Sequence, residues 1–202
     1  MKIVFSVLVG YLLGSISSAI LLSRAKYLVD IRKRGSGNAG AANMTRVHGL
    51  GAGLTTLGCD MCKTALAGLG GWLLAGHLGL VAACGACLIG HCWPVFHHFR
   101  GGKGVSVSAC IALLLDWRMF LVLLALFAVI FLLGRRVSLC SVILAALYPL
   151  IYLLVGHGTD AGFWLCCGVT VIVLFCHRGN IRRLLRGEEP RLTFGKDKQG
   201  QG

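Results

Sequence analysis

Long apolar runs divide this chain of 202 residues. Five stretches carry no charged side chain: 3–22, 64–99, 119–134, 137–159 and 161–177. Runs of roughly 17–25 apolar residues are long enough to cross a bilayer as helices. The pattern therefore predicts an all-α, polytopic transmembrane helix bundle.

The positions of the basic residues indicate how many times the chain crosses. With seven spans, 17 of the 20 Lys and Arg residues fall on one side, Lys2 and Arg118 fall on the other, and Lys63 lies within a span. The positive-inside rule makes the crowded side cytoplasmic and puts the N-terminus outside. The stretch 104–116 would form a helix of only about 20 Å, short of a roughly 30 Å core, so five or six spans are alternatives.

The composition leaves little room for anything outside the membrane. Hydrophobic residues make up 56% of the chain, and the formal net charge is +13. We expect a single transmembrane domain over residues 1–186 and a short cytoplasmic tail over 187–202. The first apolar run has no basic segment beyond Lys2 and no Ala-x-Ala cleavage site, so it is interpreted as a retained span. Membrane lipids are expected partners, and nucleic acid is not.

Two pairs of cysteines have the spacing C-x-x-C, namely Cys59 with Cys62 and Cys84 with Cys87. In apolar helical sequence this spacing puts two small side chains on one face, which favours packing over zinc binding or redox chemistry. No His-Glu-x-x-His or carboxylate-rich site appears. We therefore expect neither a metal nor a cofactor.

Asp60 and Lys63 are an acid and a base separated by three residues inside the predicted second span. Ionisable residues within a membrane often mark a functional site. At this spacing on a helix, however, they also neutralise each other. A structural pair and a support for the site both remain open.

The first of three polar clusters predicts an interfacial helix on the cytoplasmic side, over about 38–47. Ser36 and Asn38 can cap this helix, so that its N–H groups face an anion. Arg46 lies about two turns along and can reach back to the same place. The alternative is an interfacial helix whose basic face attracts anionic lipid.

The second cluster is a basic turn rich in glycine, with Gly101, Gly102 and Gly104 around Lys103. Such a turn allows backbone N–H groups and an ammonium to converge on an anion. It is not a nucleotide P-loop, which requires a glycine where His97 stands and Ser or Thr where Gly104 stands. A phosphate other than that of ATP is the expected ligand.

The third cluster follows the last span. His177 and Asn180 share one helix face, which is more specific than the surrounding Arg residues alone. The alternative is a basic stop-transfer tail. No Gly-x-Ser-x-Gly elbow occurs, and no His is followed five positions later by Asp, as in one large class of glycerolipid acyltransferases.

Several motifs in order give the chain a resemblance to a known family. They occupy 14–15, 35–43 with Arg46, 57–63, 90–96, 99–105, and 177–183 with Gly187 and Glu189. In these residues the chain resembles the bacterial membrane family of acyl-phosphate:glycerol-3-phosphate acyltransferases. The resemblance implies transfer of a fatty acyl group from acyl phosphate to the 1-hydroxyl of sn-glycerol 3-phosphate, giving lysophosphatidic acid for phospholipid synthesis at the bacterial inner membrane.

The same resemblance implies roles for individual residues. It makes four residues catalytic: Ser36, Arg46, His177 and Asn180. It assigns substrate and phosphate binding to Asn38, Asn43, Gly101, Gly102, Lys103, Gly104 and Glu189. Either His177 or the departing phosphate takes the proton of the attacking hydroxyl.

Two other kinds of protein remain as alternatives. The first is a transporter or channel for a phosphorylated or other anionic solute. It needs polar groups near the bilayer midplane, where only Asp60 and Lys63 are expected. The second is a non-catalytic anchor that binds anionic lipid, which explains the charges but not Ser36, Asn38, His177 and Asn180.

Overall fold

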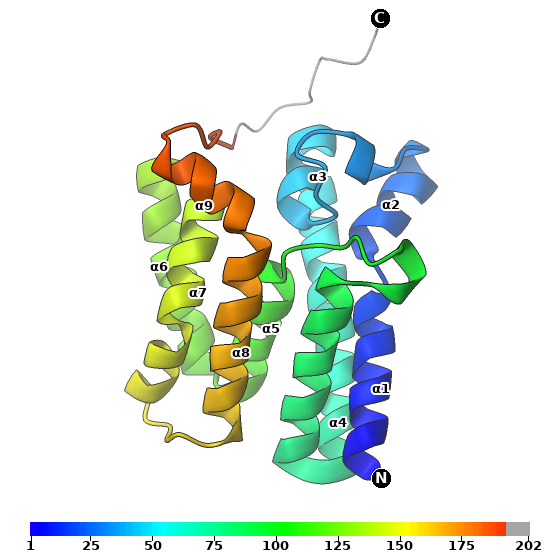
Figure 1. Cartoon of the computed structure of the whole chain (residues 1–202), viewed down its shortest axis with the longest axis vertical. Helices are drawn as coiled ribbons and strands as arrows, with labels where there is room; N and C mark the ends of the chain where they lie inside the picture. The colour runs from blue at the N-terminus through cyan, green and yellow to red at the C-terminus, as the bar shows by residue number, and fades with distance from the viewer. Residues whose placement is uncertain (193–202) are drawn as a thin grey trace, which may run out of the picture.

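A computed structural model describes residues 1–192 as a bundle of helices, without a strand in that range (Figure 1). The predicted all-α class is confirmed. The rest of the predicted tail, including Lys196 and Lys198, lies outside the described residues. The elements are α1 (Lys2–Ser15), α2 (Ser18–Tyr27), η1 (Ile31–Lys33), α3 (Ala41–His48), α4 (Leu50–Cys92), η2 (Val95–His97), α5 (Val105–Leu115), α6 (Trp117–Gly134), α7 (Val137–Leu154), α8 (Ala161–Cys176) and α9 (Arg178–Leu185).

Several helical stretches are long and apolar enough to cross a membrane. Four qualify by length and composition: Lys2–Tyr27, Leu50–His97, Trp117–Gly134 and Val137–Leu154. The pair α8 and α9 becomes a fifth if its 64° bend is counted within one span. Helix α5 has only 11 residues, or about 16 Å, in agreement with the short stretch expected there.

Helix α4 reverses direction inside its own bounds. Ala75 and Gly76 have non-helical backbone angles, and Gly76 takes the positive φ of 60° that glycine tolerates best. Beyond this point the second arm of α4 returns beside the first (Figure 1). Gly71 and Gly79 face each other so closely that neither position has room for a Cβ atom.

The helices form two groups with a shared interior. Helices α1 to α4 make one group and α5 to α9 the other (Figure 1). Helix α1 lies against the second arm of α4 because Gly10 and Gly14 admit the backbone of Ala83 and Cys87. The larger core includes Leu88, Ile111, Met119, Tyr152 and Val169, whereas a smaller core under α3 contains Ile20, Ile31 and Met44.

The cysteines follow the packing prediction only in part. Cys84 and Cys87 are buried in the larger core, but Cys59 and Cys62 are exposed on the apolar outer surface. All ten cysteines are free thiols. Within residues 1–192, no group of three or more His, Cys, Asp or Glu residues is placed to hold a metal ion.

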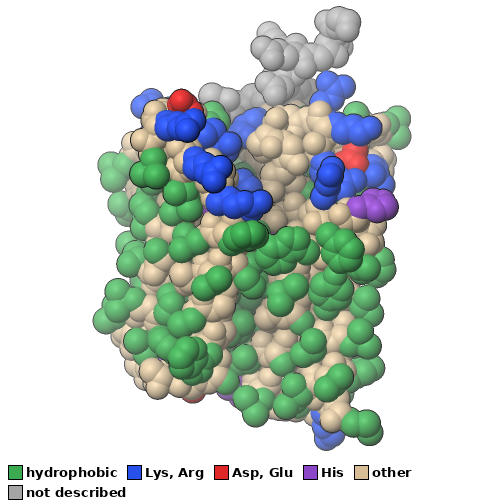
Figure 2. Space-filling model, in the orientation of Figure 1, with side chains coloured by type: hydrophobic (Ala, Val, Ile, Leu, Met, Phe, Trp, Pro, Cys, Tyr) green, Lys and Arg blue, Asp and Glu red, His purple; other side chains and the backbone are tan. Residues whose placement is uncertain are grey.

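Charge and apolar surface are separated along the bundle. Lys and Arg side chains gather over the end formed by α2, α3 and α9, and hydrophobic side chains cover most of the surface below them (Figure 2). The N-terminus lies at the opposite end (Figure 1). This end-to-end asymmetry is the one expected from the sequence, and it puts all three polar clusters at the basic end.

Candidate active site

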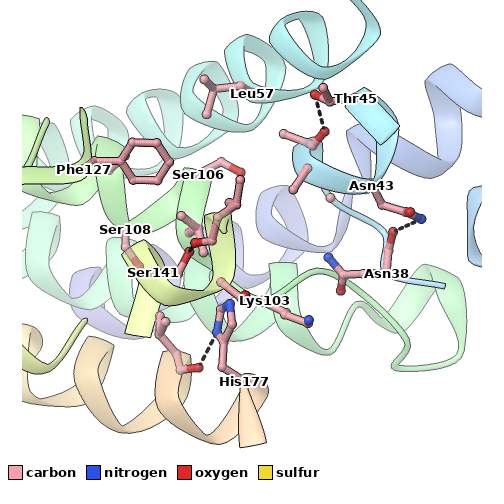
Figure 3. Close-up of a pocket in the computed structure, with 18 of the residues that line it drawn as sticks. Asn38, Asn43, Thr45, Leu57, Lys103, Ser106, Ser108, Phe127, Ser141 and His177 are labelled. Atoms are coloured by element: carbon pink, nitrogen blue, oxygen red, sulfur yellow. Dashed lines mark hydrogen bonds between the residues drawn. The ribbon is translucent and has the colours of Figure 1, made fainter. Parts of the chain in front are cut away.

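A cavity of about 840 Å³ opens where the three polar clusters meet. Eight predicted residues line it, from three segments far apart in the chain: Ser36, Asn38, Asn43, Arg46, Lys103, His177, Asn180 and Glu189. The side chains of Asn38, Lys103 and His177 point into the same space (Figure 3). The remaining wall is largely apolar, with side chains such as Leu57 and Phe127.

The first loop is held by the side chain of Asn43, which is 1% exposed. Its Nδ2 donates to the carbonyl oxygens of Ile31, Arg34 and Asn38, and its Oδ1 accepts from the amide of Ser36 at 2.8 Å. Four contacts engage the whole side-chain amide, which therefore shapes the loop that carries Ser36 and Asn38.

The predicted capping of α3 is wrong. The helix begins at Ala41, with Gly40 as its N-cap and no side-chain cap bond. Ser36 and Asn38 belong to the preceding loop, where Gly35 and Gly37 take positive φ angles of 57° and 73°. Asn43 holds this loop away from the helical path, so neither side chain caps α3. The first turn of α3 still faces the cavity through Ala41 and Ala42.

The glycine turn works differently from the expected anion cradle. The amide of Gly101 donates to the carbonyl of Cys92 at 3.2 Å, and that of Gly102 donates to the carbonyl of His91 at 3.0 Å. Both amides therefore cap the end of α4 instead of facing an anion. Glycine is required because a Cβ atom at either position would overlap His91, and because Gly104 has a φ of 85°.

Lys103 begins a chain of hydrogen bonds along the wall of the cavity. Its ammonium donates to Oδ1 of Asn180, and Nδ2 of Asn180 donates to Oε1 of Glu189 at 2.6 Å. The carboxylate of Glu189 also accepts from Ser138 at 2.6 Å and from Arg183 at 2.8 Å. Glu189 thus fixes which end of the Asn180 amide faces Lys103.

This chain of contacts continues past residue 186, into the first residues of the predicted tail. Glu189 is 6% exposed, and the amide of Leu192 donates to the carbonyl of Arg135 at 2.7 Å. The backbone carbonyl of Glu189 accepts from Nε of Arg136. Residues 187–192 therefore pack against the body of the protein and complete the wall of the cavity.

The protonation of the site follows from burial and partners. Burial lowers the pKa of the Lys103 ammonium, and the carboxylate of Glu189 opposes this shift. Burial alone would raise the pKa of Glu189, but hydrogen bonds from Ser138, Asn180 and Arg183 lower it. The net effect is an ionised Glu189 carboxylate at neutral pH.

His177 lies between α8 and α9 and is 3% exposed. Burial lowers its pKa to about 4, so the imidazole is neutral at neutral pH. Its Nδ1 lies 2.8 Å from the carbonyl oxygen of Val173, which only accepts, so Nδ1 carries the proton. The lone pair of Nε2 is then available as a hydrogen-bond acceptor.

Known proteins are similar to this chain in sequence and in overall fold. The profile of the family described as glycerol-3-phosphate acyltransferase matches residues 4–187. The glycerol-3-phosphate acyltransferase of Rubrobacter xylanophilus is 42% identical over 98% of both chains, and that of Finegoldia magna is 39% identical over 92% of this chain and 93% of its own. The chain belongs to the glycerol-3-phosphate acyltransferase family.

Solved structures agree with this assignment. This chain resembles the crystal structure of PlsY (YgiH), an integral membrane glycerol 3-phosphate acyltransferase, in its glycerol 3-phosphate form. The TM-score is 0.89 and the sequence identity is 31%, over 96% of both chains. The lysophosphatidic acid form gives a TM-score of 0.86 and 30% identity, over 97% of both chains.

Sequence reasoning missed several residues around the cavity of this acyltransferase. Ser138 and Ser141 lie three residues apart on one face of α7, and both line the cavity. His91 and Ser106 line it as well. The spacing of the two serines in an otherwise apolar run was a usable signal, but no local pattern indicated which helix faced them.

Proposed function

We propose that this protein transfers a fatty acyl group from acyl phosphate to the 1-hydroxyl of sn-glycerol 3-phosphate, giving lysophosphatidic acid. The supporting observation is a single cavity with a cationic, polar mouth and an apolar remainder. One proposed substrate is a small phosphate ester, and the other joins a phosphate to a long hydrocarbon chain. A cavity with these two parts suits both.

The cationic mouth suits two phosphate groups. We assign one to Lys103 and Asn180, and the other to Arg46 with Ser36 and Asn38. The second also faces the first turn of α3, where the positive end of the helix dipole favours an anion. Asn43 and Glu189 act one step away, because their hydrogen-bonding groups are directed at the protein. Gly101 and Gly102 supply shape instead of amide donors.

The chemistry requires little help from acid or base. The 1-hydroxyl oxygen attacks the acyl carbonyl carbon, a C–O bond forms, and the bond from that carbon to the phosphate oxygen breaks. Holding both substrates in one cavity lowers the barrier by about 7–11 kcal/mol. Nε2 of His177 accepts a hydrogen bond from the hydroxyl and orients it, and the departing phosphate takes the proton. His177 as the base is the competing version.

We assign seven spans to the chain: α1, the two arms of α4, α5, α6, α7 and α8. The basic end is then cytoplasmic and carries the active site and the C-terminus, while the N-terminus is outside a bacterial inner membrane. The one-sided basic residues support this orientation (Figure 2). This orientation can be tested with a protease-cleavable tag at each terminus of the protein in sealed vesicles that keep the orientation of the cell membrane. Protease added outside should cut the tag at the N-terminus and leave the tag at the C-terminus intact.

The activity is tested with the purified protein in lipid vesicles. Labelled glycerol 3-phosphate is offered with palmitoyl phosphate or with palmitoyl-CoA, and lysophosphatidic acid is extracted and counted. We expect product from acyl phosphate alone, at least about 100-fold less from Lys103→Ala, and unchanged product from the exposed control Lys33→Ala. Product from palmitoyl-CoA alone would overturn the assignment of acyl phosphate as the donor. Product from neither donor would overturn the proposed acyltransferase activity.

A further inference from the structure

A second group of charged side chains lies among the helices, next to the glycine turn. Asp60 and Lys63 on the first arm of α4 form an ion pair at 2.9 Å, and His91 on the second arm lies 3.1 Å from Lys63. The three residues are 1%, 6% and 5% exposed. Burying charges among apolar helices is costly unless they are well paired, so this cluster needs an explanation.

The cluster ties together the segments that surround the glycine turn. Nζ of Lys63 donates to the carbonyl oxygens of Gly14 at 3.1 Å and Ile16 at 2.7 Å, where α1 ends. The carboxylate of Asp60 accepts from Ser18 at the start of α2, and from Ser106 in the first turn of α5. All these contacts converge around the end of α4 that carries His91.

The contact with Lys63 fixes the tautomer of His91. The ammonium of Lys63 has three N–H donors and no acceptor, and it shares them among two carbonyl oxygens, the Asp60 carboxylate and Nδ1, so Nδ1 at 3.1 Å can only accept. The carboxylate of Asp60 is 3.6 Å from Nδ1, beyond hydrogen-bond length. A neutral His91 therefore carries its proton on Nε2, at the opposite edge of the ring.

That opposite edge lies directly against the glycine turn. A Cβ atom at Gly102 would overlap Nε2 and its ring neighbours, so the Cα atom of Gly102 rests on the imidazole. The amide of Gly102 is bonded to the carbonyl of the same histidine at 3.0 Å. The next residue is Lys103, so both the ring and the backbone of His91 set where the Lys103 side chain starts.

We infer that Asp60, Lys63 and His91 form a positioning triad that places Lys103 against the phosphate of glycerol 3-phosphate. Lys63 and Asp60 hold the imidazole in one orientation and one tautomer. The imidazole supports Gly102, and Gly102 delivers Lys103 to Asn180 and the cavity. None of the three has to touch the reacting atoms. This inference rests on the proposed function, because it deepens the role of Lys103 there.

One test reads the ring itself and needs no activity. In the protein labelled with ¹⁵N-histidine, His91 should give the nitrogen shifts of the Nε2–H tautomer, assigned by loss of the signals in His91→Phe. In Lys63→Met this signature should change to the other tautomer or to an exchange average. An Nδ1–H tautomer in the wild type, or no change in Lys63→Met, overturns the triad.

A second test separates positioning from support of the fold. His91→Phe keeps a ring against Gly102 but removes Nδ1, and it should raise KM for glycerol 3-phosphate about tenfold while leaving KM for acyl phosphate within twofold. Lys103→Ala should raise the first KM about 100-fold. If His91 acts through Lys103, the double variant should match Lys103→Ala within threefold.

The outcomes of the second test are distinct. The inference is overturned if the effects of His91→Phe and Lys103→Ala on KM for glycerol 3-phosphate multiply in the double variant. It is also overturned if His91→Phe changes KM for glycerol 3-phosphate and KM for acyl phosphate equally. His77→Phe, an exposed histidine at the turn of α4, is the matched control and should behave as the wild type. If the wild type makes no product, the proposed function fails, and the tautomer measurement still decides whether the ring is held by Lys63.

Discussion

The ammonium of Lys103 donates to Oδ1 of Asn180, across 77 residues of chain. This bond joins the glycine turn to the first turn of α9, and both residues line the cavity. Both side chains are held in one orientation, because Nδ2 of Asn180 is bonded to Glu189 and Oδ1 of Asn180 is bonded to Lys103. The relationship turns two separate motifs into one binding surface.

Asn180→Ala should therefore impair the enzyme more than the loss of one contact suggests. The variant leaves the half-buried Lys103 without its acceptor and Glu189 without one donor. A hydrogen bond to a charged group contributes about 1.5–3 kcal/mol, so we expect kcat/KM for glycerol 3-phosphate to fall about 100-fold. Steady-state kinetics in vesicles measure this. Arg182→Ala on the same helix is the exposed control, and a loss below threefold in Asn180→Ala would contradict the linkage.

Glu189→Gln should lower stability by a different route. In the wild type Oε1 accepts from Ser138 and Asn180, while Oε2 accepts from Arg183. Glutamine replaces one of these oxygens with an NH₂ group, so at least one donor faces another donor. We expect a loss of about 2 kcal/mol, or roughly 4–8 °C in the thermal unfolding midpoint. Glu188→Gln, which is exposed, should stay within 1 °C, and equal midpoints for both variants would rule out this role.

The apolar runs predicted most of the helices, because a helix is the simplest way to pair every backbone N–H and C=O group within a membrane. His177 and Asn180, which are close in sequence, do line the same cavity, although His177 lies at the bend between α8 and α9 and not within one continuous helix. The basic residues likewise indicated which end of the bundle would carry the site. These inferences needed only local spacing and the physics of the bilayer.

Other features depended on partners that spacing does not specify. Asn43 appeared to be a ligand-binding residue, yet its amide contacts carbonyls up to 12 residues away in an irregular loop. The amides of Gly101 and Gly102 appeared available for an anion, but the turn folds back onto the end of α4. Glycine marks a tight backbone path, and the sequence does not say whether a ligand or the protein itself comes close.

Gly102→Ala tests this steric interpretation of the glycine turn. The added methyl group would overlap the ring of His91, so the turn must shift and carry Lys103 with it. We expect KM for glycerol 3-phosphate to rise at least tenfold, with kcat changed less. Gly70→Ala is the matched control, because a Cβ atom there meets nothing within 4 Å, and alanine favours a helix by about 1 kcal/mol. Equal kinetics in the two variants would refute the interpretation.

The titration of His177 provides a test of the proton's destination. Burial lowers its pKa to about 4, whereas an exposed histidine has a pKa of about 6.5. Protonation therefore favours the unfolded state, and the stability contributed by neutral His177 is present above pH 6.5 and lost as pH falls towards 4. Between pH 5 and 8 the histidine should stay neutral, so its titration should not change kcat/KM in that range of pH.

The ratio of wild-type kcat/KM to that of His177→Gln isolates this effect, because the titration of the substrate phosphate, with a pKa of about 6, affects both proteins equally. We expect a constant ratio from pH 5 to 8 and a loss below about 100-fold, since the departing phosphate takes the proton and His177 only orients the hydroxyl. If His177 titrated near 6.5, the ratio would fall about tenfold per unit below that pH. A constant ratio with a loss of 10³-fold or more would instead make a neutral His177 the base, since general-base catalysis contributes about 10²–10⁴-fold.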